Sequence, residues 1–339
     1  MKFLLAGCIY LLGAIGAMGA MGAPGAHAAG FQTVALPGPQ GKPITLAIWY
    51  PSQAPVRTLN MGTFGQDVAS NGAIDGAHLP MVLISHGNGG SQYSHHDTAL
   101  ALAEAGFVVA ALTHPGDNYA DQSAATDILA RPAQVVAVLD YMLTAWPQRG
   151  RIAPARVGLF GFSSGGFTAL VNIGAQPDMG KVATHCAAYP AHYACTLVAK
   201  HGQPASQAAD KASAPPAAMP EPRIRAAVIA APALGFTFDA AALGKVSIPI
   251  QLWRAADDMI VPHPWSSEQV RAALPRKPDY QVVPGAGHFD FLAPCSDKLA
   301  ALAPQICVSQ EGFDRTAFHR RFNAQVIGFF KASLRDAGQ

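Results

Sequence analysis

A serine, an aspartate and a histidine in this 339-residue chain stand where together they could cleave an acyl bond. Ser163 is at the centre of the stretch "GFSSG", Asp257 and Asp258 follow in "RAADDMIVP", and His288 follows in "VPGAGHFDF". A serine hydroxyl is a weak nucleophile until a histidine takes its proton, and that histidine needs a carboxylate to hold its tautomer. The order serine, acid, histidine therefore predicts nucleophilic catalysis of acyl transfer.

The residues around Ser163 predict a sharp turn between a strand and a helix. The apolar stretch "RVGLF" precedes it and reads as a buried strand, and "SGGFTALVNIG" follows with helical spacing. G-x-S-x-G in this context is typical of a nucleophile elbow. The first N–H groups of the helix favour negative charge, so the backbone N–H of Ser164 is expected to be one of the two donors of an oxyanion hole.

The rest of the chain alternates strands and helices. Continuously apolar strands indicate burial on both faces, as in central parallel strands, and helical segments lie between them. The alternation predicts an α/β fold, a mostly parallel sheet with helices on both faces. The expected strands are 43–51, 81–85, 107–112, 156–160, 226–231 and 249–253; the expected helices are 96–105, 132–145, 164–174, 266–274 and 316–334; residues 52–78, rich in Gly, Asn and Ser, are expected to form a loop.

Residues 29–339 are expected to form a single domain with an insertion at about 176–222. The insertion carries two cysteines and the low-complexity run "PASQAADKASAPPAAMPEP". Placed between a helix and a central strand, it is expected to run over the carboxyl edge of the sheet. It is either a surface loop or a partial lid over a binding site.

Residues 1–28 have the pattern of a secretory signal peptide. Lys2 is followed by a long apolar run and then by the triplet Ala26-His27-Ala28, after which cleavage is expected. An uncleaved membrane anchor and a lipoprotein attached through Cys8 are the alternatives. The pattern predicts a periplasmic or secreted protein without stable membrane insertion once the leader is removed.

Four cysteines remain after the leader, and an exported compartment favours disulfides. Their close spacing suggests the pairs Cys186 with Cys195 and Cys295 with Cys307, although other pairings are formally open. The second pair would brace the loop that carries His288. No C-x-x-C spacing appears, so no metal site is predicted.

The charge pattern argues against a polyanionic partner. The net charge is +2, and the basic residues are scattered without a run of Lys and Arg. Neither nucleic acid nor an anionic surface is therefore expected as a partner.

The chain resembles the α/β-hydrolase superfamily, and within it the group of predicted dienelactone hydrolases, which are related to platelet-activating factor acetylhydrolases and to bacterial polyester hydrolases. The motifs are "WYP", "SHGNGGS", "THPGDN", "GLFGFSSGG", "DDMIVP", "VPGAGHFDFLAPC" and "FDRTAFH". The resemblance implies the α/β-hydrolase fold. It implies that Asp258, in D-x-x-V-P, is the acid and that the backbone N–H of Asn88, in "HGNGG", is the second oxyanion donor. Dienelactone hydrolases carry cysteine at the elbow, so Ser163 favours ordinary ester chemistry.

Four further residues are candidates for the substrate pocket. Tyr93, Trp265 and Phe289 lie just beyond the expected active-site loops, and His114 follows a central strand. Packing in the core is an equal alternative for the three aromatic residues.

These patterns together predict an exported serine hydrolase that cleaves carboxylic esters through a Ser163-His288-Asp258 triad and an acyl-enzyme intermediate. The substrate would be a small-molecule or polymeric ester, and the chemistry requires no cofactor or metal. An amidase or peptidase would use the same triad. A hydrolase-like binding protein without catalysis is the alternative from another class.

Overall fold

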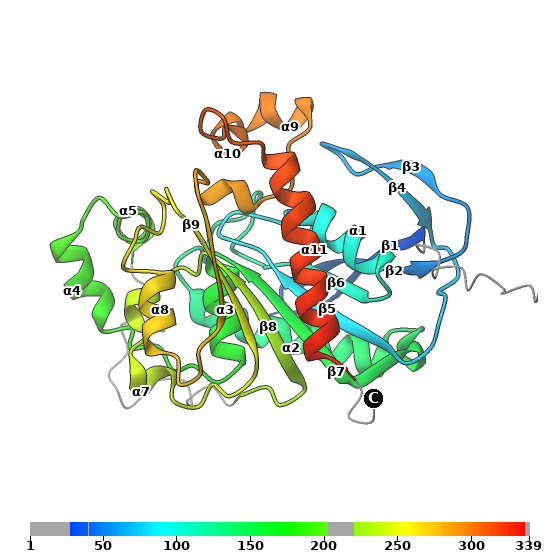
Figure 1. Ribbon diagram of the computed structural model, residues 1–339, viewed down its shortest axis with the longest axis horizontal. Helices are drawn as coiled ribbons and strands as arrows, with labels where there is room; N and C mark the ends of the chain where they lie inside the picture. Colours follow the sequence, from blue (N-terminus) through cyan, green and yellow to red (C-terminus); the bar gives the residue numbers. More distant parts are fainter. Residues whose placement is uncertain (1–27, 40, 203–219, 336–339) are drawn as a thin grey trace, which may run out of the picture.

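The sheet of the computed structural model, which describes residues 28–39, 41–202 and 220–335, has ten strands in the order β10-β9-β8-β7-β5-β6-β2-β1-β4-β3 (Figure 1). The strands from β6 to β10 in this order pair in parallel, whereas β2 is antiparallel to both β6 and β1. The strands are β1 (Ala28–Pro37), β2 (Pro43–Ser52), β3 (Arg57–Asn60), β4 (Gly65–Ser70), β5 (Leu79–Ser85), β6 (Val108–Thr113), β7 (Ile152–Phe162), β8 (Ile224–Ala230), β9 (Ile250–Ala255) and β10 (Asp279–Val283).

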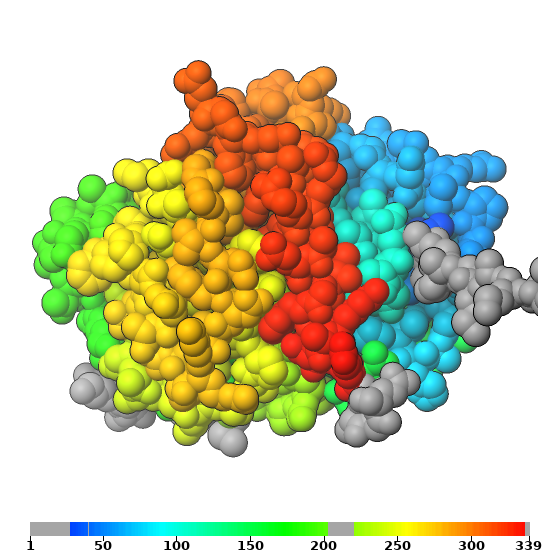
Figure 2. All heavy atoms as spheres, in the orientation of Figure 1, coloured from blue at the N-terminus to red at the C-terminus, as the bar shows by residue number. Residues whose placement is uncertain are grey.

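Helices cover both faces of the sheet, as the continuous apolar strands predict. On β5, Met81 and Leu83 enter one buried cluster, whereas Val82 and Ile84 enter the other. The long helix α11 crosses one face of the molecule, where its outer side is visible in Figure 2. One face is covered by α1 (His96–Glu104) and α11 (Arg315–Ser333); the other by α2 (Arg131–Asp140), α3 (Ser164–Asn172), α7 (Ala240–Leu243) and α8 (Ser267–Ala273).

One helical segment of the described residues, Ile128–Ala145, is long and apolar enough to span a membrane by length and composition. It combines α2 with one short helical turn before it and another after it. Val135, Val138 and Leu139 are fully buried in the cluster beneath the sheet. The segment therefore packs as a core helix of this fold.

The prediction that residues 52–78 form a loop was wrong. This segment contains β3 and β4, which pair with each other, and β4 extends the sheet beside β1. The Nε1 of Trp49 donates to Oε1 of Gln66 at 2.8 Å and holds β4 against the core. Both strands are short and mostly exposed on one side, so they lack the continuous apolar run that revealed the central strands.

The described part of the insertion contains two helices, α4 (Lys181–Ala188) and α5 (Tyr193–His201), at one end of the sheet (Figure 1). We call residues 181–201 the α4–α5 hairpin. The low-complexity part of the insertion at 203–219, and the expected leader up to residue 27, lie outside the described residues. The signal peptide and the single-domain boundary therefore stay predictions.

Two disulfides lie within the described part of the chain, in the two pairs suggested by the spacing. Cys186–Cys195 joins α4 to α5, and Cys295–Cys307 encloses α9 (Asp297–Leu302) and reaches the end of α10 (Pro304–Cys307). Disulfides persist in oxidising compartments. They point to an extracellular or periplasmic protein.

Candidate active site

The elbow around Ser163 is a tight turn between β7 and α3. Ser163 has φ = 53°, a left-handed conformation that is uncommon for a residue with a side chain. A Cβ at Gly165 would stand 1.9 Å from the carbonyl oxygen of Ser85, and one at Gly161 would stand 2.2 Å from the carbonyl oxygen of Gly165. Glycine is therefore required on both sides of the strained serine.

The structure brings Ser163, His288 and Asp258 together in one hydrogen-bonded chain. His288 Nε2 lies 3.0 Å from Ser163 Oγ, and His288 Nδ1 lies 2.7 Å from Asp258 Oδ2. All three residues are buried, with exposed fractions of 7%, 4% and 6% for serine, histidine and aspartate. The neighbouring Asp257 is exposed.

Asp258 is held in place by the loop that follows it. Its Oδ1 accepts hydrogen bonds from the backbone N–H groups of Ile260 at 2.9 Å and Val261 at 2.8 Å. These bonds leave Oδ2 aimed at the ring of His288. A carboxylate fixed in this way can orient the imidazole and stabilise its positive charge.

The backbone N–H groups of Asn88 and Ser164 are available as hydrogen-bond donors. Among the residues that the structure describes, no hydrogen bond uses either group. Asn88 itself is fixed by its side chain, whose Nδ2 donates to Asp117 Oδ1 at 2.6 Å and whose Oδ1 accepts from the hydroxyl of Tyr193 at 2.6 Å. Asp117 Oδ1 also accepts from the N–H of Gly89 at 3.1 Å.

Comparisons with known proteins found a family model and similar solved structures. The model of the dienelactone hydrolase family matches residues 69–219, which include Asn88 and Ser163. A solved ferulic acid esterase from Streptomyces cinnamoneus superposes with a TM-score of 0.58 at 17% identity, covering 94% of this chain and 93% of that chain. The protein has the α/β-hydrolase fold. A comparison of the sequence with curated proteins found no match, and the family match supports a hydrolase.

A buried ion pair contacts residues 86–90, which carry Asn88 and which we call the Asn88 loop. Arg131 Nη1 is 2.5 Å from Asp117 Oδ2, and the same guanidinium donates to the carbonyl oxygen of His86. Arg131 is 1% exposed and Asp117 is 3% exposed. Sequence reasoning missed both residues, although Asp117 belongs to the motif "THPGDN" at the end of a central strand.

His114 lies in the core and does not line the cavity described below. It is fully buried, with Nδ1 donating to Gln134 Oε1 at 2.7 Å and Nε2 lying 2.8 Å from Ser85 Oγ. The neighbouring His86 accepts a bond from the backbone N–H of His114 at 3.0 Å. Burial, and then the charge of Arg131, hold the pKa of both histidines well below the usual value. The neutral rings of His86 and His114 therefore pack in the core next to the Asn88 loop.

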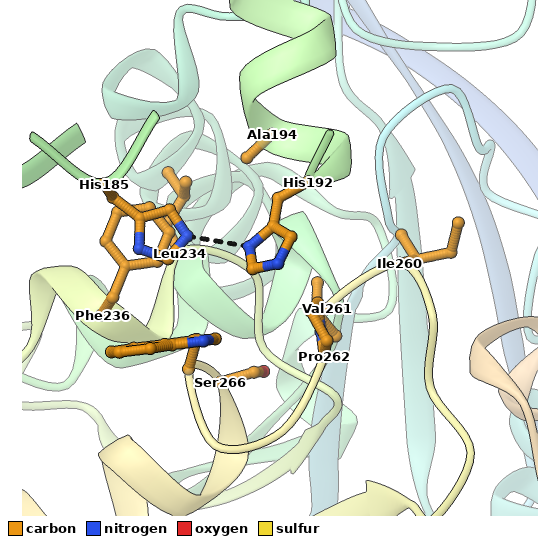
Figure 3. A pocket seen from close by; sticks show the side chains of 10 residues that line it. His185, His192, Ala194, Leu234, Phe236, Ile260, Val261, Pro262 and Ser266 are labelled. Atoms are coloured by element: carbon orange, nitrogen blue, oxygen red, sulfur yellow. Dashed lines mark hydrogen bonds between the residues drawn. The ribbon is translucent and has the colours of Figure 1, made fainter. Parts of the chain in front are cut away.

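The other three candidate pocket residues lie in different surroundings. Trp265 lines a cavity. His185 and His192 of the α4–α5 hairpin and Val261 after β9 line the same cavity (Figure 3). Tyr93 packs against Trp49 and Phe64 and does not line this cavity. Phe289 stands edge-on to the ring of His288, with ring centres 5.4 Å apart, and does not line it either.

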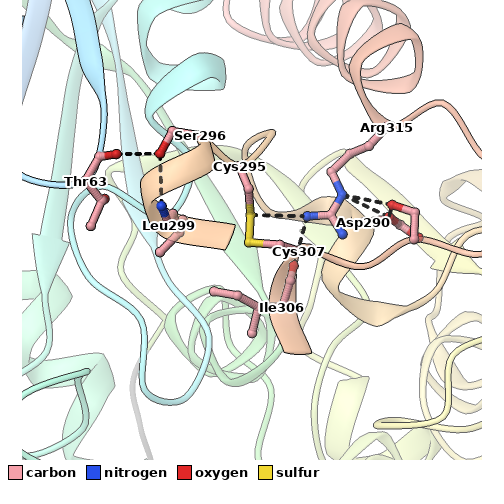
Figure 4. The surroundings of a disulfide bond; sticks show 9 residues. Thr63, Asp290, Cys295, Ser296, Leu299, Ile306, Cys307 and Arg315 are labelled. Carbon is pink, nitrogen blue, oxygen red and sulfur yellow. Dashed lines mark hydrogen bonds and ion pairs between the residues drawn. A yellow bond between two sulfur atoms is a disulfide. The ribbon is translucent and has the colours of Figure 1, made fainter. Parts of the chain in front are cut away.

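The loop that carries His288 is braced by the second disulfide and by α11 (Figure 4). Asp290 Oδ2 accepts from the N–H of Gly287 at 2.8 Å, and its Oδ1 accepts from Arg315 Nε at 2.9 Å. Arg315 also donates to the carbonyl of Ile306 at 2.9 Å, and its Nη1 lies 3.9 Å from the sulfur of Cys295. The disulfide therefore supports Arg315, and Arg315 supports the turn that precedes His288.

A second histidine, His319, ties the same loop to α1. Its Nε2 lies 2.9 Å from the carbonyl oxygen of Asp290, and its Nδ1 lies 2.6 Å from Asp97 Oδ2. Burial alone would raise the pKa of Asp97, but the charge and hydrogen bond of His319 outweigh it and hold this pKa well below its usual value.

We expect this contact to make stability depend on pH. Because the pKa of Asp97 is lower in the folded protein than in the unfolded chain, the contact stabilises above pH ~4 and is lost as the pH falls below it. Asp97→Asn should lower the free energy of unfolding at pH 7 by about 1.5–3 kcal/mol and flatten its decline between pH 5 and 3. Urea titrations at stepped pH measure both effects, and parallel pH profiles of the two proteins would contradict the assignment.

Proposed function

We propose that the protein is an exported serine hydrolase that cleaves carboxylic esters through a Ser163-His288-Asp258 triad. The observation that carries the proposal is the hydrogen-bonded chain from Ser163 Oγ to His288 at 3.0 Å and from His288 to Asp258 at 2.7 Å. These distances lie within the range in which a base can take a proton from a nucleophile. The strained elbow supports the same assignment, because it lifts Ser163 out of the regular strand.

Each residue then has one role. Ser163 Oγ attacks the acyl carbonyl while His288 Nε2 takes the hydroxyl proton, and Asp258 stabilises the imidazolium that forms. The N–H groups of Asn88 and Ser164 donate to the oxygen that becomes negative; in a comparable site, losing one donor costs about 3–4 kcal/mol of transition-state stabilisation. His288 returns the proton to the leaving alcohol, and water then hydrolyses the acyl-enzyme through the same base.

Three further observations support the ester assignment and the export. The family match supports a hydrolase, and the protein with the similar fold is named a ferulic acid esterase. A serine at the elbow, where dienelactone hydrolases carry cysteine, favours ester chemistry. The two disulfides and the leader-like residues 1–28 favour a periplasmic or secreted location.

Labelling and a matched pair of substrates test the proposal. A fluorophosphonate probe should add one adduct to the purified protein, on the tryptic peptide that contains Ser163. The protein should hydrolyse p-nitrophenyl acetate much faster than p-nitroacetanilide. Faster cleavage of the anilide would make the protein an amidase, and absence of both label and turnover would favour a non-catalytic binding protein.

The hydroxyl of Tyr193 is expected to hold the Asn88 loop in position, because it donates a hydrogen bond to Asn88 Oδ1. Tyr193→Phe removes this bond alone and should lower kcat for p-nitrophenyl acetate about three- to tenfold, the effect of one neutral hydrogen bond, with KM little changed. Tyr189→Phe is the matched control, since it makes the same change on the same hairpin and is expected to retain full activity. Equal rates for Tyr193→Phe and the wild type would contradict this role.

A further inference from the structure

The carbonyl oxygen of Gly87 accepts two hydrogen bonds within the Asn88 loop. His86 Nδ1 lies 2.5 Å from this oxygen, and the backbone N–H of Gly90 donates to it at 3.2 Å. A Cβ at Gly90 would stand 2.9 Å from His86 Nδ1, so the loop fits closely around the imidazole. The Gly87 carbonyl is therefore fixed from within the loop by one side chain and one backbone group.

The surroundings of His86 determine which ring nitrogen carries the proton. Nε2 accepts a hydrogen bond from the backbone N–H of His114 at 3.0 Å, so this nitrogen is unprotonated. In a neutral imidazole the proton then lies on Nδ1, which donates it to the Gly87 carbonyl. Burial, and then the charge of Arg131, hold the pKa of His86 well below its usual value, so the ring is neutral near pH 7. The side chain is 1% exposed, and bulk water does not reach it.

The Gly87 carbonyl and the Asn88 N–H belong to the same peptide group. This group is planar and trans, so its C=O and N–H bonds point in opposite directions. A hydrogen bond that fixes the carbonyl therefore also fixes the direction of the N–H, on the side away from the ring of His86. Within the described part of the chain, no group accepts a hydrogen bond from the Asn88 N–H.

This peptide group adjoins the nucleophile elbow. A Cβ at Gly87 would stand 3.2 Å from Ser163 Cβ and 3.1 Å from the ring of Phe162. Only a residue without a side chain allows the loop to approach the elbow so closely. The Asn88 N–H follows directly in the chain, beside the point at which Ser163 would attack an acyl carbonyl.

Building on the proposed ester hydrolysis, we propose that His86 is a positioning residue of the oxyanion hole, whose Nδ1–H holds the Gly87–Asn88 peptide group so that the Asn88 N–H donates to the oxyanion. Glycine does not restrict its own backbone torsions, so this peptide group needs a partner that fixes it. The bond to the carbonyl also polarises the peptide group, and hydrogen bonds linked in this way strengthen one another. His86 acts through the backbone alone.

Two variants of the same shape test this role. Asn and Leu have the same branching, but only Asn carries an NH₂ group where His86 has Nδ1, and both lose the acceptor for the His114 N–H. His86→Leu should lower kcat for p-nitrophenyl acetate about 10- to 100-fold, because a misplaced oxyanion donor contributes little. His86→Asn keeps a donor to the Gly87 carbonyl, and its kcat should exceed that of His86→Leu about tenfold. A kcat no higher than that of His86→Leu would overturn the proposal, since altered packing is common to both variants.

Two NMR measurements do not depend on catalysis and separate this proposal from the proposed function. In the wild-type protein with ¹⁵N-labelled histidine, His86 should be the neutral Nδ1–H tautomer at pH 7; the Nε2–H tautomer or a charged ring would overturn the proposal even if neither variant folds. The residual dipolar coupling of the Asn88 N–H reports the direction of this bond. It should keep its wild-type value in His86→Asn and change in His86→Leu, and an unchanged value in His86→Leu would also overturn the proposal. If no ester is hydrolysed, the proposed function fails, while these measurements still decide whether His86 orients the Asn88 N–H.

Discussion

Replacing Ser163 by alanine is expected to lower kcat/KM for p-nitrophenyl acetate by about 10⁴-fold or more, the usual consequence of removing a triad nucleophile. Replacing the adjacent Ser164 by alanine should change it by less than about threefold, because the proposed donor of Ser164 is its backbone N–H, which alanine retains. Each variant removes one serine hydroxyl, and the two positions are adjacent in the chain. The difference between their activities therefore distinguishes a reacting side chain, proposed for Ser163, from a backbone N–H that stabilises the oxyanion, proposed for Ser164.

The stability of the two variants provides the control for this comparison. Both residues are buried, and the Ser163 hydroxyl contacts His288, so unfolding in urea should be measured beside the kinetics. The Ser163→Ala protein should stay folded and take no label from a fluorophosphonate, whereas the Ser164→Ala protein should be labelled. The opposite pattern would mean that the nucleophile of the doublet is Ser164.

The features that could be predicted from the sequence are those encoded in short stretches of chain. The elbow needs glycine on both sides of one serine, and this requirement is visible as G-x-S-x-G. Central strands are buried on both faces, so they appear as continuous apolar runs such as 81–85 and 226–231. The α/β fold and the order serine, acid, histidine follow from such local signals, whereas the α/β-hydrolase fold and the choice of Asp258 over Asp257 followed from the family resemblance.

The supporting groups escaped prediction because their partners are far apart in the chain. Tyr193 and Asn88 are 105 positions apart in the sequence, and no pattern near either residue predicts their hydrogen bond. Arg131 appears in the sequence as one basic residue at the start of an apolar helix. Its burial is explained only when the structure brings Asp117 and the carbonyl of His86 to it. The cysteine spacing suggested a local loop closed by Cys186 and Cys195, but the helices α4 and α5 and the cavity that they line depend on how this segment packs.

Breaking the Arg131–Asp117 ion pair, which contacts the Asn88 loop, is expected to have the largest effect on stability. Arg131→Met leaves Asp117 as a buried charge without its cation, which should lower the free energy of unfolding by about 3–5 kcal/mol. Lys42 and Asp121 form an exposed pair at 3.1 Å, with side chains 52% and 42% exposed. Lys42→Ala should lower the free energy of unfolding by less than about 1 kcal/mol. Urea unfolding of the two single variants therefore compares a buried ion pair with an exposed one.

The double variant Arg131→Met/Asp117→Asn distinguishes stability from catalysis. With the charge of Asp117 removed as well, part of the lost stability should return, because two neutral groups replace two buried ions. Activity should return only in part: an amide oxygen accepts the bonds of Asn88 and Gly89 more weakly than the carboxylate of Asp117, and the bond from Arg131 to the carbonyl of His86 stays lost. If the double variant regains stability but keeps a low kcat, the ion pair positions the Asn88 loop for catalysis. If stability and kcat both recover, the ion pair only stabilises the core.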